Sequence, residues 1–268
     1  MLAVKQRVLG PEHPDTLTTM NNLAGLYRDQ GEYSPARSLF TGVLEVRRRV
    51  LGPEHAHTLI SMNNLGLLYQ YERKYAHAES LLSKTYQVRR RVLGQDHPDT
   101  LLSINNLAFL YANEGKYDSA EPLYLQVIAA QARVLGRQHP RRLATMNDLA
   151  ALYLKRHKYT LAEPLLRDAL NDFQNTNMTT WARYRCESLL GAIAVAQNRY
   201  AEAEPLLLSG YDGLVNTQQT IPWERRPVIR ECAEWIVQLY ETSARPDKAA
   251  KWREKVPALH GDLQPSIR

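Results

Sequence analysis

A nine-residue segment recurs four times along this chain at a constant interval. It reads LGPEHPDTL at 9–17, LGPEHAHTL at 51–59, LGQDHPDTL at 93–101 and LGRQHPRRL at 135–143, which is a period of 42 residues. Tyrosine keeps the same step at positions 33, 75, 117 and 159, and Tyr200 follows after 41 residues. A fixed period of roughly 20 to 50 residues is typical of a tandem array of supersecondary units. The chain is therefore expected to fold as stacked copies of one unit.

Each unit is predicted to contain two helices. Apolar residues recur at helical spacing in two runs, Met20, Leu23, Ala24 and Tyr27, then Tyr33, Ala36, Phe40 and Val43. Between the two runs, Gly31, Gly115 and Asn198 suit a left-handed helix end, whereas Arg73 and His157 suit it less well. The second helix should stop at Gly52, with Pro53 just beyond it.

The units should stack into an all-α fold. Small residues at 24, 66, 108 and 150 of the first helices should meet alanines at 36, 78, 120 and 162 of the second helices, which lets the helices approach closely. Because a lone helix pair cannot bury its apolar face, we expect an α-solenoid, a right-handed superhelix of stacked antiparallel helix pairs. One solenoid is predicted over 1–256, comprising the end of a truncated repeat (1–8), regular repeats (9–50, 51–92, 93–134, 135–176), a degenerate repeat (177–215) and a capping helix pair (216–256), before a flexible tail (257–268).

The repeat resembles a known family. The pattern L-[AG]-x-x-Y, a turn, then Y-x-x-A-E-x-L is clearest in NNLAFLYANEGKYDSAEPLY (105–124) and resembles the tetratricopeptide repeat. The 42-residue period, with NNLA in the first helix and LG-x-x-HP-x-T-L between units, is similar to the kinesin light chain variety. The resemblance is strong from Leu9 to about Thr176 and weaker to about Val256. It implies a module that binds other proteins.

The two ends of the chain suggest a piece of a larger protein. MLAVKQRVLG (1–10) aligns with VLEVRRRVLG (43–52), the end of a second helix, so the first unit lacks its first half. Residues 203–214 and 239–255 are similar to the closing repeats of bacterial arrays, which are often tethered to signalling domains. We therefore expect a fragment or partial array, whose N-terminal repeat face could self-associate.

Composition excludes several classes of function. The net charge of +6 is not focused, so no nucleic-acid ligand is expected. No run of apolar residues is long enough for a membrane span. Two distant cysteines, Cys186 and Cys232, exclude a disulfide framework and favour a cytoplasmic location. No phosphate-binding loop, nucleophile motif or metal-ligand spacing is present, so neither enzyme activity nor a cofactor is expected.

Two charged motifs recur with the repeat. The histidines at 13, 55, 97 and 139 precede helix starts and are interpreted as turn residues rather than metal ligands, because equivalent positions of stacked repeats lie about 10 Å apart. The triplets 47–49 and 89–91 are interpreted as a solvated arginine-rich outer face, with a patch for an acidic partner as the alternative. The four tryptophans, all in the last third, are expected to cap the array or to dock a neighbouring domain.

A polar ladder on the first helices is the predicted binding site. Its residues, expected to face a concave groove, are Asn22, Asn64, Asn106, Asp148, Leu67, Tyr71, Phe109, Asn113 and Lys155. Carboxamides can bond to the main chain of any extended peptide, and apolar neighbours can supply side-chain pockets. In the kinesin light chain variety, asparagines of NNLA contact bound peptide, which the resemblance extends to 22, 64 and 106. The alternative is that these asparagines bond neighbouring helices together.

These patterns predict a non-catalytic module that binds a peptide or partner protein. The ligand is expected to carry apolar anchors and to be acidic at the end that meets Lys155, although Asp148 would repel acidic groups. The alternative is a scaffold or regulatory segment of a larger signalling protein, acting by intramolecular docking or self-association.

Overall fold

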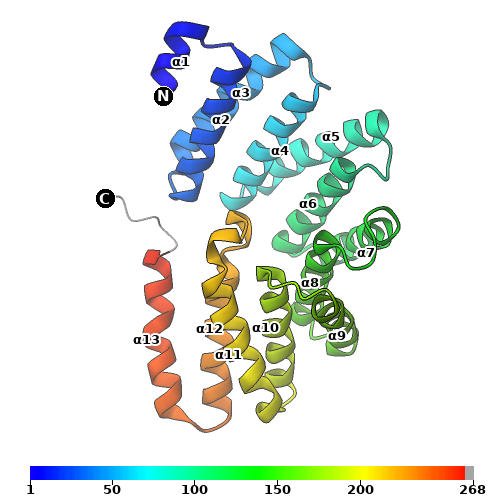
Figure 1. Ribbon diagram of the computed structural model, residues 1–268, viewed down its shortest axis with the longest axis vertical. Helices are drawn as coiled ribbons and strands as arrows, with labels where there is room; N and C mark the ends of the chain where they lie inside the picture. Colours follow the sequence, from blue (N-terminus) through cyan, green and yellow to red (C-terminus); the bar gives the residue numbers. More distant parts are fainter. Residues whose placement is uncertain (263–268) are drawn as a thin grey trace. The chain divides into compact units, whose positions relative to one another are not determined.

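The computed structural model describes residues 1–262, except for the side chains of Glu224 and of 257–262, and residues 263–268 lie outside it. The described chain consists of helices and turns and contains no strand, so the predicted all-α fold of helix pairs is confirmed (Figure 1). The first helices are α2 (Pro14–Asp29), α4 (Ala56–Tyr71), α6 (Pro98–Glu114), α8 (Pro140–Lys155), α10 (Trp181–Ala196) and α12 (Pro227–Thr242). The second helices are α3 (Tyr33–Leu51), α5 (Tyr75–Leu93), α7 (Tyr117–Val134), α9 (Tyr159–Asn175), α11 (Tyr200–Asn216) and α13 (Pro246–Asp262). The short α1 (Leu2–Leu9) precedes them, and two 3₁₀ turns, η1 (Gln218–Thr220) and η2 (Trp223–Arg225), lie between α11 and α12.

The recurring histidine caps the N-terminus of a first helix. The backbone N–H of Asp15 donates to Nδ1 of His13 at 3.2 Å, and the same bond recurs at His55, His97 and His139 over 3.1–3.2 Å. Each ring satisfies one of the N–H groups that a helix start leaves without an intrahelical acceptor. The segment therefore ends one helix and starts the next, as the sequence predicts.

The turn inside each pair is left-handed at one residue. Glycine supplies this conformation at Gly31 (φ 79°) and Gly115 (φ 84°). Arg73 (φ 56°) and His157 (φ 55°) adopt it at equivalent positions, although a side chain is disfavoured there. The turn geometry is thus imposed by the helix pair even where the sequence offers a poor residue for it.

Two compact units make up the chain, one from Met1 to Gly115 and the other from Lys116 onward. In unit 1, Ala24, Ala36, Phe40, Met62 and Leu68 belong to one core cluster. In unit 2, Leu207, Ile221, Ile229, Cys232 and Ile236 form a core against which Trp181, Trp235 and Trp252 pack. Three of the four tryptophans thus contribute to the core of the last repeats.

The helical region is longer at its C-terminal end than predicted. A flexible tail is expected from 257, but α13 continues to Asp262. Pro257 suggests a boundary because it lacks an N–H donor, yet its fixed φ is itself helical. The remainder of the predicted tail, 263–268, lies outside the described residues.

Candidate functional site

Seven of the nine predicted site residues lie on the first helices of unit 1. We call the stripe that contains them the first-helix face, and its members are Thr18, Asn22, Ile60, Asn64, Leu67, Tyr71, Leu102, Asn106, Phe109 and Asn113. Among its asparagines, Asn22 and Asn113 are exposed, Asn64 is half-buried and Asn106 is only 9% exposed. The accessible polar surface therefore lies mainly on α2 and α4.

Two asparagine bridges connect neighbouring first helices. Nδ2 of Asn64 donates to Oδ1 of Asn21 at 3.2 Å, which joins α4 to α2. Nδ2 of Asn106 donates to Oδ1 of Asn63 at 2.9 Å, which joins α6 to α4. Each bond uses one of the two N–H groups of the donating carboxamide. The NN pair of each repeat thus contributes to the stack, the role that the sequence leaves open beside peptide binding.

Apolar side chains lie along the same stripe. Leu67 is 8% exposed and belongs to the core, so it offers a ligand little surface. Tyr71 and Phe109 are half-buried, and the Tyr71 ring lies 6.4 Å from that of Tyr33 between centroids. Ile60 and Leu102, which the sequence places on the stripe but not among the site residues, are 39% and 38% exposed. They are the most accessible large apolar groups of this face, and their exact 42-residue spacing is the signal that could have identified them.

The other two predicted residues, Asp148 and Lys155, lie on α8 in unit 2. The Asp148 carboxylate is paired with the guanidinium of Arg225, and these side chains are only 14% and 13% exposed. Arg225 comes from the segment between α11 and α12, which we call the strap (residues 217–226). Because α10 packs against both α8 and α12, the strap reaches past one first helix to contact another. Asp148 is therefore neutralised within unit 2, a partner that the sequence expectation of repulsion did not include.

Further charges on unit 2 are matched internally. Nη1 of Arg185 lies 2.7 Å from Oε2 of Glu231. Burial raises the pKa of Glu231, but the charges of Arg185, Lys155 and Arg225 outweigh it, and the pKa is lowered overall. Lys155, although exposed, thus already interacts with a carboxylate of its own unit. This arrangement weakens the case for an acidic ligand at Lys155.

The arginine triplets are not uniformly solvated, which corrects the expectation of an outer arginine face. Arg47 and Arg89 are each 5% exposed. Nη1 of Arg47 donates to Oγ of Ser61 at 2.8 Å, and Nη1 of Arg89 donates to Oγ of Ser103 at 2.9 Å. The first arginine of each triplet faces the following first helix, where a serine and a main-chain carbonyl receive it. Burial lowers the pKa of both guanidinium groups.

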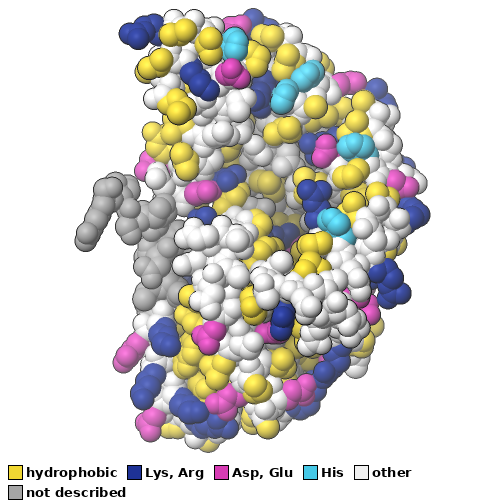
Figure 2. Space-filling model, in the orientation of Figure 1, with side chains coloured by type: hydrophobic (Ala, Val, Ile, Leu, Met, Phe, Trp, Pro, Cys, Tyr) yellow, Lys and Arg dark blue, Asp and Glu magenta, His cyan; other side chains and the backbone are white. Residues whose placement is uncertain are grey.

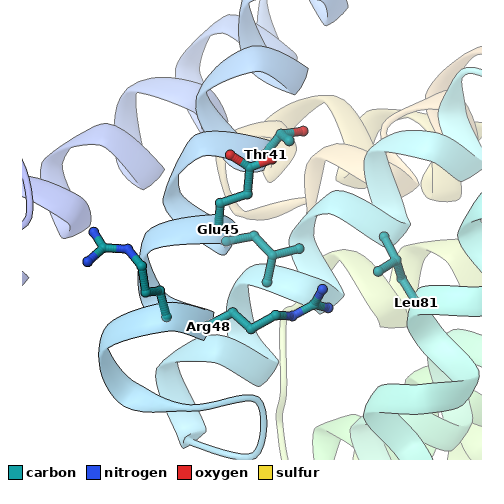
Figure 3. Close-up of a pocket in the computed structure, with 6 residues that line it drawn as sticks. Thr41, Glu45, Arg48 and Leu81 are labelled. Carbon is teal, nitrogen blue, oxygen red and sulfur yellow. The ribbon is translucent and has the colours of Figure 1, made fainter.

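The outer arginines border a shallow cavity between second helices. It has a volume of about 400 Å³ and is lined by Thr41, Leu44, Glu45, Arg48 and Arg49 of α3 and by Leu81 of α5 (Figure 3). Arg49 also pairs with Glu12. Its polar groups belong to the opposite set of helices from the predicted ladder, so the cavity is separate from the first-helix face.

Metal binding and membrane insertion find no support in the described residues. No group of three or more histidine, cysteine, aspartate or glutamate side chains gathers there to hold an ion. On the face that Figure 2 shows, histidine side chains form separate small groups. None of the helices described here is long and apolar enough to cross a membrane.

Comparison with known families identifies the repeat. Two family models, both described as tetratricopeptide repeat, match residues 16–57, 58–99 and 99–175, which together exceed half of the chain. The chain belongs to the tetratricopeptide repeat family. Tetratricopeptide repeats indicate a protein–protein interaction module, and such repeats are in general non-catalytic scaffolds. A search of curated proteins found no match.

Solved structures with the same fold include a kinesin light chain relative. Nearly identical repeats assigned to a kinesin light chain of Podosopora anserina are 28% identical over 77% of this chain and 98% of that one, with a TM-score of 0.64. The quorum sensor NprR of B. thuringiensis is 14% identical over 97% and 80% of the two chains (TM-score 0.65). A Rap conjugation regulator of plasmid pLS20, in complex with the Phr* peptide, is 11% identical over 92% and 74% (TM-score 0.62). The predicted resemblance to kinesin light chain-like tetratricopeptide repeats is thereby confirmed.

Proposed function

We propose that this tetratricopeptide repeat protein is a non-catalytic module that binds an extended peptide, or an extended segment of a partner protein, on the first-helix face of unit 1. The observation that carries the proposal is the alignment of accessible carboxamides with accessible apolar side chains. Asn22 and Asn64 lie on the same stripe as Ile60 and Leu102, which are more than a third exposed. Repeat arrays commonly use such extended surfaces for binding.

The chemistry of this face suits a main chain more than a single side chain. A carboxamide offers two N–H donors and a carbonyl acceptor, so it can pair with a peptide group whatever the peptide sequence. Apolar residues beside it supply affinity and side-chain selection. A Rap protein of the same fold is in complex with a peptide, which supports this type of ligand.

The proposed site is confined to unit 1. On unit 2, Asp148 is already paired with Arg225, and the charge of Lys155 already acts on Glu231. A peptide would have to replace these internal interactions to use the same positions of α8. Apolar anchors therefore matter more to the proposed ligand than acidic residues.

Self-association is a second candidate function, favoured by one exposed leucine. Leu26 on α2 is 59% exposed, whereas its equivalents Leu68, Leu110 and Leu152 are at most 2% exposed. Leu26 thus belongs to a face that later repeats bury, and a second copy of this chain could cover it. Sedimentation analysis should then show a concentration-dependent dimer that Leu26→Ser abolishes, and a monomer at all concentrations would exclude this function.

A matched pair of variants tests the peptide-binding proposal. Asn64→Ala removes the bridge to Asn21 and also the carboxamide offered to the peptide, whereas Asn21→Ala removes only the bridge. Peptides selected from a random library on the native chain should bind Asn64→Ala at least ten-fold more weakly and Asn21→Ala nearly normally. Equal losses in both variants would mean that Asn64 acts only in the stack, and the proposal would fail at its central residue.

A further inference from the structure

The first-helix face exposes two large aliphatic side chains at equivalent positions of consecutive repeats. Ile60 on α4 and Leu102 on α6 are 42 residues apart and almost equally exposed, at 39% and 38%. The equivalent residues of the flanking repeats are Thr18 and Ala144, which are polar and small. Bulky apolar anchoring positions are thus restricted to one adjacent pair.

The distance between these two positions is set by helix packing. The bridge from Asn106 to Asn63 shows that α4 and α6 are in direct contact. Helices in contact pack with their axes about 8–10 Å apart. Because Ile60 and Leu102 occupy the same position of successive repeats, a ligand must present its two apolar anchors on one side, at about the same separation.

Few peptide conformations meet this condition. A β-strand rises about 3.3 Å per residue and alternates its faces, so residues i and i+2 share a face only about 7 Å apart, and i and i+3 face opposite ways. Polyproline II has three residues per turn and a rise of about 3.1 Å, so i and i+3 share a face about 9 Å apart. An α-helix reaches about 10 Å with i and i+7, but its peptide groups are bonded internally and offer little to a carboxamide.

The backbone of polyproline II also fits the polar part of the face. It makes no internal hydrogen bonds, so its N–H and C=O groups remain open to partners. Asn64 lies one helical turn from Ile60 on the same stripe, and Asn106 has the same relation to Leu102. Tyr71 and Phe109 lie further along the two helices, and aromatic side chains commonly line surfaces that bind polyproline II segments.

We propose that the first-helix face of unit 1 selects a peptide in the polyproline II conformation with large apolar residues at i and i+3, which contact Ile60 and Leu102. This inference rests on the proposed function and specifies its ligand. It requires no charged residue in the motif, and prolines between the anchors should favour binding because they pre-form the bound conformation.

A set of synthetic peptides tests the spacing. Each fluorescein-labelled peptide carries two leucines at i and i+2, i+3, i+4 or i+7, with either proline or alanine among the intervening residues and with constant net charge. Polarisation is measured against the full chain. The i,i+3 peptide with proline is expected to bind at least ten-fold more tightly than the i,i+2 and i,i+4 peptides. Tightest binding by i,i+2 would indicate a strand, tightest binding by i,i+7 would indicate a helix, and either result would overturn the proposal.

Substitutions borrowed from the chain's own repeats locate the anchors. Ile60→Thr and Leu102→Ala introduce the residues that stand at the equivalent positions 18 and 144, so the fold should accept them. Each should weaken the i,i+3 peptide by about ten-fold, in keeping with the loss of one buried aliphatic contact. The control Leu125→Ala, a 49% exposed leucine on α7, should leave binding unchanged. Equal effects of all three variants would overturn the assignment of the anchors.

Failure of this inference can be told from failure of the proposed function. If library peptides bind and depend on Asn64 but show no i,i+3 preference, the function stands and the polyproline II ligand is wrong. If neither the leucine peptides nor the library yields a ligand, both are wrong.

Discussion

Histidine replaces the usual serine, threonine, aspartate or asparagine as the N-cap of four first helices in this chain. Only a ring nitrogen without a proton can accept the backbone N–H, so the cap requires a neutral imidazole. At His139, burial and the positive charge of Arg141 lower the pKa, which keeps the ring neutral. This cap should therefore make stability depend on pH.

The sign of that dependence is fixed by the direction of the shift. Because the folded protein binds a proton at His139 less readily than the unfolded chain does, stability is fully present above the ordinary pKa of 6.5 and is lost as pH falls below it. His139→Ser keeps an acceptor but does not titrate. Urea midpoints of unit 2, followed by tryptophan fluorescence, should fall less in the variant than in the native protein between pH 7.5 and pH 5.5. An equal fall would show that the cap does not titrate in this range.

The left-handed turn inside each helix pair supplies a second prediction at the scale of single residues. Arg73 and Gly115 occupy equivalent positions with positive φ, at 56° and 84°. A side chain costs about 1–2 kcal/mol in this conformation, so Arg73→Gly should raise the free energy of unfolding by up to about 1 kcal/mol once the greater chain entropy of glycine is counted. Gly115→Arg should lower it by a similar amount. Opposite signs in chemical denaturation would confirm the argument, and equal signs would contradict it.

At the scale of elements, helix spacing in the degenerate repeat depends on glycine. A β-carbon at Gly213 of α11 would overlap the ring of Tyr184 on α10, whereas nothing lies within 4 Å of one at Gly42 of α3. Gly213→Ala should therefore destabilise the protein by about 1–3 kcal/mol through overpacking. Gly42→Ala should stabilise it by about 0.5–1 kcal/mol through helix propensity. Thermal or urea unfolding measures both, and a stabilised Gly213→Ala would show that Tyr184 moves aside at little cost.

Much of the element pattern could be predicted from local signals. The period, the apolar stripes and the histidine–proline starts specify the helix pairs, because each signal acts within a turn or two of chain. Burial of Arg47 and Arg89 was not predicted, since it depends on Ser61 and Ser103 fourteen residues away on the next helix. The same limit applies to the asparagine bridges, whose partners lie 43 residues apart in sequence.

The strap shows why the site could not be predicted completely. Arg225 pairs with Asp148 across 77 residues of sequence, and no local pattern relates the two. The repeat is degenerate where the strap occurs, so periodicity gives no register for it. The charge at a predicted ladder position was thus misjudged because a distant segment neutralises it.

At the scale of the whole molecule, the intrinsic probes are unevenly distributed. All four tryptophans and both cysteines lie beyond residue 115, in unit 2, whereas helices occur in both units. Repeat arrays gain stability from neighbouring units, so distant parts can unfold at different denaturant concentrations. Phe40→Ala, in the core of unit 1, should therefore lower the urea midpoint measured by circular dichroism more than that measured by tryptophan fluorescence. Equal shifts would show that the chain unfolds as one cooperative body.

The buried thiols offer a check on the same experiment. Burial raises the pKa of Cys232 to about 12, and both cysteines are fully buried. A thiol reagent should therefore modify them only when unit 2 opens. Labelling that follows the fluorescence transition, and not the dichroism transition, would assign each signal to its unit.

Titration calorimetry of one library-selected peptide with the native chain, Asn64→Ala and Asn21→Ala tests the central claim most directly. The account predicts that Asn64→Ala weakens binding at least ten-fold while Asn21→Ala stays within about two-fold of the native affinity, because only Asn64 is offered to the peptide. Equal weakening by the two substitutions, or none by either, would contradict the claim that the first-helix face of unit 1 is the binding site.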